Sequence, residues 1–197
     1  CKLGGNDANR AFNESLSLRF EGDFDRIAFE KALNSLIMRH QSLRAAFTVD
    51  GSQMVVFKDL PLNYSFEDLS MSSLNQIQKE NLIKKYARNE VMHIFDLLYG
   101  PLFKFSLIKF SEKEFFFTLT AHHIICDGWS IGLLIQDLGK FYSSYVQNII
   151  PVLPEADQFT SYAREQSKFI ASNEYVRNEN FWLDQFKNNI PDRKSVV

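Results

Sequence analysis

The apolar positions of the first forty residues change from a strand period to a helix period. Residues 15–21 alternate polar and apolar side chains, which is typical of a half-buried strand. In the next segment, Asp25 can accept hydrogen bonds from the free amides of a first helical turn, and Phe24 and Phe29 are spaced as a hydrophobic staple. The pattern predicts a helix that runs from there to about His40.

Turn residues predict a hairpin after this helix. Asp50-Gly51 suits the positive φ angles of a tight turn, and residues 43–48 and 53–58 on either side are expected to pair. The following stretch, residues 61–70, is expected to be irregular.

A second helix and a second hairpin are predicted in the middle of the chain. Ser73 and Gln76 form a capping-box pattern ahead of an apolar helical stripe, which ends before Phe95. The segments 103–110 and 114–121 both alternate apolar and polar residues, so they are expected to form antiparallel strands.

The last part of the chain is predicted to be helical. Ser130 is a natural N-cap for a third long helix, and two further helices are predicted at 157–171 and 174–188. Because hairpins are mixed with crossover connections, the element order favours a mixed sheet over a doubly wound parallel one. We therefore expect an α/β fold, a mixed-sheet two-layer sandwich.

Composition and charge narrow the functional class. Phe accounts for 19 of the 197 residues, which predicts an aromatic core. A net charge of -2 without a Lys/Arg cluster argues against a nucleic acid partner. The apolar runs are too short for a membrane span and no secretion signal is present, so we expect a cytoplasmic chain without a membrane partner. Cys1 and Cys126 form no CxxC pair, and no disulfide framework or thiolate zinc site is expected.

A cluster of polar residues lies where a predicted strand meets the third long helix, in the run Ala121-His122-His123-Ile124-Ile125-Cys126-Asp127-Gly128-Trp129-Ser130. Successive strand residues point to opposite faces, so His122 and His123 cannot both face one substrate. One would be catalytic and the other structural. A neutral imidazole is well suited to accept a proton near pH 7, which suggests a general base.

The residues after the histidines can support such a base. Asp127 is too polar to be buried alone, and Arg44 is a candidate partner for it. Gly128 allows backbone conformations closed to other residues, and the amides that open a helix at Ser130 offer a positive end for an oxyanion. Base, shaped loop and helix dipole together suggest acyl transfer.

Each of these residues also has a plainer interpretation. A His at a strand end is more often a hydrogen-bonded structural residue, Asp127-Gly128 can be a simple turn, and Trp129 can anchor a core or an interface. The two histidines and Asp127 could ligate a metal, although adjacent histidines diverge and no further His, Cys or acidic ligand is obviously supplied. Cys126 could be a nucleophile, but a neighbouring carboxylate favours a small buried thiol.

Three ordered segments carry a resemblance to a known family. The run from His122 to Ser130 resembles the HHxxxDGxS signature of nonribosomal peptide synthetase condensation domains. Residues 39–47, Arg-His-Gln-Ser-Leu-Arg-Ala-Ala-Phe, are similar to the family's RHExLRTxF segment, and residues 95–102, Phe-Asp-Leu-Leu-Tyr-Gly-Pro-Leu, resemble its FDLxxGPL segment. The resemblance covers about residues 12–190, and it places the chain in the chloramphenicol-acetyltransferase-like superfamily.

The resemblance implies a role for each residue of the cluster. His123 is implied to be the catalytic residue when an aminoacyl amine attacks an acyl thioester and forms an amide. Asp127 is implied to form a structural salt bridge with Arg44. Donor and acceptor are expected on the phosphopantetheine arms of carrier domains, beside an adenylation domain, with no metal and no directly bound cofactor. The supporting active-site residues are implied to be His122, Asp127, Gly128, Trp129 and Ser130.

The family's fold has two similar lobes with the active site at their junction. By resemblance, residues 1–155 are the N-terminal lobe with the HHxxxDG loop, and residues 156–197 are the helical start of the crossing to a C-terminal lobe absent from this chain. The start at Cys1, without an initiator Met, also suggests a piece of a longer protein. We therefore expect this fragment to be inactive by itself.

The sequence departs from the family in places, and two other functions stay open. Gln41 stands where the family's segment has Glu, and residues 159–166 lack the Asp and Trp of a later motif. One alternative is a stand-alone acyltransferase of the superfamily that uses acyl-CoA or an acyl carrier protein. The other is a non-catalytic docking module.

Overall fold

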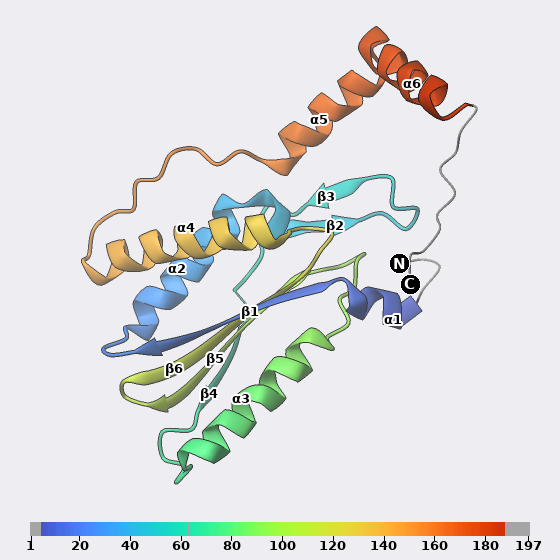
Figure 1. Ribbon diagram of the computed structural model, residues 1–197. Helices are drawn as coiled ribbons and strands as arrows, with labels where there is room; N and C mark the ends of the chain where they lie inside the picture. Colours follow the sequence, from blue (N-terminus) through green and yellow to red (C-terminus); the bar gives the residue numbers. More distant parts are fainter. Residues whose placement is uncertain (1–4, 63, 188–197) are drawn as a thin grey trace. The chain divides into compact units, whose positions relative to one another are not determined.

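A mixed four-stranded sheet organises the first of two compact units, Cys1–Ala156. The computed structural model describes residues 5–62 and 64–187. The strand order is β1 (Asn13–Glu21), β6 (Glu114–His122), β5 (Phe103–Ser111) and β4 (Tyr64–Asp68) (Figure 1). β1, β6 and β5 are antiparallel neighbours, whereas β4 runs parallel to β5. The predicted mixed-sheet α/β fold and the β5–β6 hairpin are confirmed.

Helices cover both faces of this sheet (Figure 1). α2 (Arg26–Arg39) and α4 (Gly128–Val146) pack on one face and against each other, while α3 (Gln76–Val91) lies on the other. α3 therefore adds a layer to the predicted two-layer sandwich. Strand alternation determines which side chains reach the larger core between the sheet, α2 and α4. From β1 and β6 these are Leu16, Leu18, Phe20, Phe115, Phe117 and Leu119.

Aromatic rings dominate this core, as the composition predicts. Phe29 of α2 stands edge-on to Phe117, with ring centroids 5.2 Å apart. Phe24 lies 5.1 Å from Phe29, and the Asp25 carboxylate accepts a hydrogen bond from the Ala28 amide at 2.9 Å. The predicted cap and staple of α2 are therefore confirmed.

The predicted hairpin around Gly51 forms a separate two-stranded sheet from β2 (Ala45–Phe47) and β3 (Met54–Val56). Gly51 has a φ of 72°, a conformation that favours glycine. A single 3-10 turn, η1 (Gln41–Arg44), connects α2 to β2.

Local predictions at two caps, one strand and one helix are wrong. Asn75, rather than Ser73, caps α3. Asp127, rather than Ser130, caps α4, because the Asp127 carboxylate accepts the Ser130 amide. Residues 64–68, expected to be irregular, form β4 because they pair with β5 across the crossover that contains α3. A short helix, α1 (Gly5–Ala11), was not predicted.

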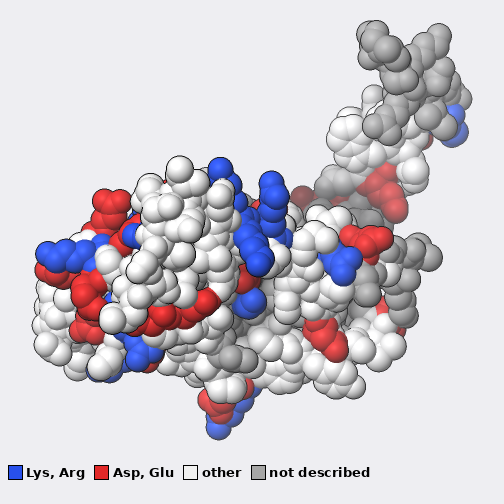
Figure 2. Space-filling view, turned by 90° about the horizontal axis from the view of Figure 1, so that it is seen from below, with Lys and Arg blue, Asp and Glu red and all other residues white. Residues whose placement is uncertain are grey.

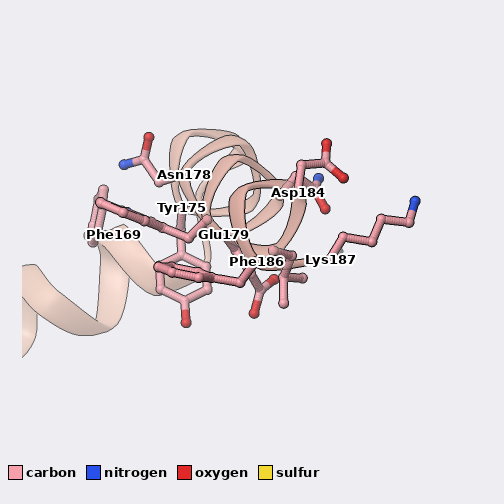
Figure 3. Close-up of a pocket in the computed structure, with 10 residues that line it drawn as sticks. Phe169, Tyr175, Asn178, Glu179, Asp184, Phe186 and Lys187 are labelled. Carbon is pink, nitrogen blue, oxygen red and sulfur yellow. The ribbon is translucent and has the colours of Figure 1, made fainter. Parts of the chain in front are cut away.

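The second unit, Asp157–Val197, contains α5 (Phe159–Ile170) and α6 (Asn173–Phe186), which confirm the two predicted helices. The expected helix end at residue 188 lies outside the described residues. Phe169 and Tyr175, with ring centroids 5.8 Å apart, lie on the same side of the helix pair as Phe186 and line an open pocket (Figure 3). None of the predicted site residues belongs to this pocket.

Charged side chains of both signs are interspersed on the face seen in Figure 2. Ion pairs join α3 to the sheet. Arg19 Nη2 of β1 lies 2.6 Å from Glu80 Oε1, and Lys104 Nζ of β5 lies 2.9 Å from Glu90 Oε1. These ion pairs help to fix α3 against the sheet face opposite α2 and α4.

Candidate active site

The pairing of β1 with β6 sets the position of the first histidine. His122 is the last residue of β6, pairs with Asn13, and is 2% exposed. Its ring contacts those of Phe12 and Phe95. Its Nδ1 accepts a hydrogen bond from the Ile124 amide at 3.1 Å, so the proton of the neutral ring is on Nε2. Burial lowers the pKa of His122, and the buried, hydrogen-bonded ring has a structural role.

The second histidine lies one residue beyond the strand and is accessible. The His123 side chain is 47% exposed, and its Nε2 is 3.4 Å from Glu14 Oε1. Glu14 pairs with Ala121, which is two positions before His123 and therefore on the same side of the sheet. The adjacent histidines thus divide as strand alternation predicts, one buried and one available to a substrate.

The loop after the histidines is fixed by the cap of α4. Asp127 Oδ1 accepts both the amide of Ser130 at 2.8 Å and its hydroxyl at 2.7 Å. These hydrogen bonds lower the pKa of the Asp127 carboxyl, which is ionised at neutral pH. Gly128 opens the helix with free space around its Cα, and Trp129 is 80% exposed. The loop therefore presents open backbone at Gly128 and an exposed indole at Trp129.

The predicted salt bridge between Arg44 and Asp127 is not formed. Arg44 is buried, and its planar guanidinium spreads its donors over several carbonyl groups instead. Asp127 is already satisfied by Ser130. Arg44 therefore stabilises the turn from α2 to β2 and its contact with the end of β3. The carbonyls that accept from Arg44 belong to Ile37, Met38, Phe57 and Lys58.

Asp137, in the middle of α4, joins this helix to the end of α2. Its Oδ2 lies 2.8 Å from Arg39 Nε and 3.0 Å from His40 Nε2, and its Oδ1 lies 3.6 Å from Lys140 Nζ. Burial alone would raise the pKa of Asp137, but the hydrogen bonds from Arg39 and His40 lower it overall. The segment at residues 39–44 and the helix of the HHxxxDG loop are held together by this cluster.

The segment that contains Phe95 is tied to the start of β1. The Asn9 side chain donates to the Phe95 carbonyl at 2.9 Å and accepts the Phe95 amide at 3.1 Å. Asn13 donates to two carbonyls just before Phe95. Phe95 is thereby held edge-on to His122, so the three segments of the family resemblance meet in one unit.

Glu14 is the site residue that sequence reasoning missed. It occupies the same face of β1 as Leu16, Leu18 and Phe20, which belong to the core. The sequence did contain a signal for Glu14. The alternation of β1 predicts an apolar residue at this position, and a carboxylate stands there instead. The predicted strand began at residue 15 and therefore left Glu14 out.

Other chemistry weighed from the sequence finds less support. Cys126 is buried, and this burial, with the carboxylates of Glu14 and Asp127, raises the pKa of its thiol to about 12, so the thiolate nucleophile is not available near pH 7. Within residues 5–62 and 64–187, no group of three or more His, Cys, Asp or Glu is placed to hold a metal ion. No helix in the same described ranges is long and apolar enough to cross a membrane. Cys1 lies outside those ranges.

Comparison with known proteins settles the family. A family model, the condensation domain, matches residues 5–195. The chain belongs to the condensation domain family. Tyrocidine synthase 3 of Brevibacillus parabrevis is 32% identical over 187 residues, which cover 94% of this condensation domain chain and 3% of the synthase. Malpinin synthetase of Mortierella alpina is 31% identical over 187 residues, covering 92% of the chain and 2% of that protein. The chain thus spans a few per cent of the length of these peptide synthetases.

Solved condensation domains share this fold. The starter condensation domain of the rhizomide synthetase RzmA superposes with a TM-score of 0.79 at 21% identity, covering 91% of this chain and 43% of that one. VibH, an NRPS condensation enzyme, gives a TM-score of 0.75 at 23% identity, covering 96% and 43%. The predicted family and the chloramphenicol-acetyltransferase-like fold are therefore confirmed. The chain spans less than half the length of each solved structure.

Proposed function

We propose that the condensation domain containing this chain forms an amide bond between two carrier-bound substrates in the cytoplasm. A donor acyl or peptidyl thioester and an acceptor amino acid arrive on the phosphopantetheine arms of two carrier domains, and an adenylation domain lies next to the condensation domain. The observation that supports this function most is the accessible imidazole of His123, held beside an ordered loop in a chain of this family.

The chemistry assigns one step to His123. The acceptor nitrogen attacks the thioester carbonyl, a C–N bond forms, and the C–S bond breaks. His123 orients the nitrogen, receives its proton and passes that proton to the departing sulfur, which leaves as a thiol. The His122 ring and the Asp127 cap hold the two ends of the loop in place, and Gly128, Trp129 and Ser130 border the space that the substrates enter.

The domain arrangement is part of the same proposal. Residues 1–155 would be the N-terminal lobe, and residues 156–197 would begin the crossing to a second lobe. The division of the chain after Ala156 supports this boundary. Because the active site of the family lies between two lobes, the isolated chain is expected to form no amide.

The test compares single His variants in the complete domain. With donor and acceptor carriers loaded, His123→Ala is expected to reduce the rate of amide formation by at least about a hundredfold, as loss of a general base does. His93→Ala makes the same change outside the predicted site, at a ring that packs against Phe95, and is expected to leave the rate unchanged. Unchanged turnover in His123→Ala would refute the assignment. A stand-alone acyltransferase would be supported instead if the wild type formed the amide from acyl-CoA and a free amine as fast as it does from the two loaded carriers.

A further inference from the structure

Glu14 is an acidic side chain on an otherwise apolar strand face, placed beside the accessible histidine. The next three residues on that face of β1, Leu16, Leu18 and Phe20, belong to the core. Glu14 Oε1 is 3.4 Å from His123 Nε2, and 40% of the Glu14 side chain remains exposed. A charged group at the edge of an aromatic core, open to solvent and next to the proposed base, is in a position to contact a substrate.

A second carboxylate, that of Asp127, lies near Glu14 and His123. Glu14 and Asp127 are both near enough to Cys126, the residue before Asp127, to raise the pKa of its thiol. His123 in turn acts on Asp127. Glu14 contacts the imidazole of His123 and Asp127 lies in the same loop, and two carboxylates near one imidazole attract a cation and disfavour an anion.

The acceptor of an amide-forming reaction is such a cation before it reacts. An α-amino group has a pKa of about 7.7–8.0 in solution, so most acceptor molecules carry an ammonium group at pH 7. An ammonium group has several N–H donors and can bind a carboxylate and an imidazole together.

We propose that Glu14, together with His123, binds the ammonium group of the acceptor and gives the site its preference for amine over hydroxyl acceptors. This inference rests on the proposed function. The ammonium group loses one proton to the imidazole of His123, which passes it to solvent. The free amine then attacks the thioester carbon, and its second proton ends on the sulfur as the C–S bond breaks. The products are an amide, a thiol and one released proton.

The test separates binding of the acceptor from the later steps. In the complete domain, Glu14→Gln is expected to raise KM for the amine acceptor about tenfold, the effect of losing one charged hydrogen bond. The values of kcat and of KM for the donor carrier are expected to change less than twofold. Glu14→Asp keeps the charge and is expected to restore part of the affinity. Glu21→Gln, the same change at the other end of β1, serves as the matched control.

An acceptor in which a hydroxyl replaces the amine supplies the second readout. Because this acceptor is neutral, its KM is expected to be the same in the wild type and in Glu14→Gln. An equal rise of KM for both acceptors would overturn the inference. A fall in kcat with an unchanged amine KM would also overturn it, because Glu14 would then only orient the ring of His123.

The two proposals can fail separately. If His123→Ala keeps full turnover, the proposed function fails whatever Glu14 does. If His123→Ala is inactive while Glu14→Gln keeps the wild-type KM for the amine, the proposed function stands and the ammonium site is refuted. The Glu14 side chain is 40% exposed, so Glu14→Gln and Glu14→Asp are expected to leave the fold intact. Circular dichroism spectra that match the wild type check this.

Discussion

Removal of the charge on Asp137 should loosen the packing of α4 on α2. Asp137→Asn keeps the size of the side chain but replaces a carboxylate that accepts from Arg39 and His40 with a neutral amide. Hydrogen bonds to charged groups contribute about 1.5–3 kcal/mol each, and breaking a buried ion pair costs about 3–5 kcal/mol. The side chains of Arg39, His40 and Asp137 are still 11–17% exposed, and the amide oxygen of Asn can accept one hydrogen bond. We therefore expect Asp137→Asn to lower the free energy of unfolding by about 2–3 kcal/mol.

Urea unfolding of this chain at pH 7.5 measures the loss. Asp23→Asn is the control. The Asp23 side chain is 96% exposed and its Oδ1 is 3.8 Å from Lys113 Nζ, so loss of this charge should lower the free energy of unfolding by at most about 0.5 kcal/mol. A double-mutant cycle with Arg39→Gln should give a coupling of at least about 1 kcal/mol between Arg39 and Asp137. Equal small losses for Asp137→Asn and Asp23→Asn, or zero coupling, would refute the reasoning.

Acid provides a second check on Asp137. The pKa of this carboxyl is lower in the fold than its ordinary value of 3.8. A lowered carboxyl pKa contributes stability that is present above the unfolded pKa and is lost as the pH falls through the folded one. The stability difference between the wild type and Asp137→Asn should therefore shrink between about pH 5 and pH 3. A difference that stays constant over that range would contradict the ion pair.

Three further outcomes are expected. Burial lowers the pKa values of His40, His93 and His122, so the folded chain prefers the neutral forms of these rings. The urea midpoint of the wild type should therefore fall as the pH drops below about 6.5, and it should fall less in His40→Gln. A midpoint that does not change with pH would contradict this. Arg44→Lys cannot reach all four carbonyl acceptors and should lower the free energy of unfolding by about 2–3 kcal/mol in the same assay. Cys126 should resist alkylation at pH 7.5 in the folded chain and react in urea, as peptide mass spectrometry can show; rapid labelling of the folded chain would contradict its burial.

Most elements could be predicted from the sequence because their apolar periods are unbroken. α2 has a complete start signal in Asp25, Phe24 and Phe29, and the structure uses all three. The cap of α3 was misplaced because Ser73 with Gln76 and Asn75 with Gln78 both fit a capping box, and the structure forms the second. β4 could not be predicted, since its strand state depends on pairing with β5 about 40 residues later in the chain.

The site was predictable as far as local pattern reaches. Strand alternation predicted that the two histidines diverge, and the structure buries His122 and leaves His123 accessible. The partners of charged residues were not predictable, because they depend on how elements pack. Arg44 binds carbonyl groups and leaves Asp127 to its own helix, while Asp137 takes the cations at the end of α2. Such pairings require the register of three elements, which no single segment encodes.

The pairing of β1 with β6 has a consequence for synthesis of the protein. Asn13 leaves the ribosome roughly 100 residues before its partner His122, which at about 5–20 residues per second is a delay of about 5–20 seconds. During that time the backbone edge of β1 has no strand to pair with. Glu14 and Glu21, near the two ends of β1, flank its apolar residues as charged gatekeepers against aggregation. The carboxylate that lies beside His123 in the folded domain thus protects the nascent chain before the site exists.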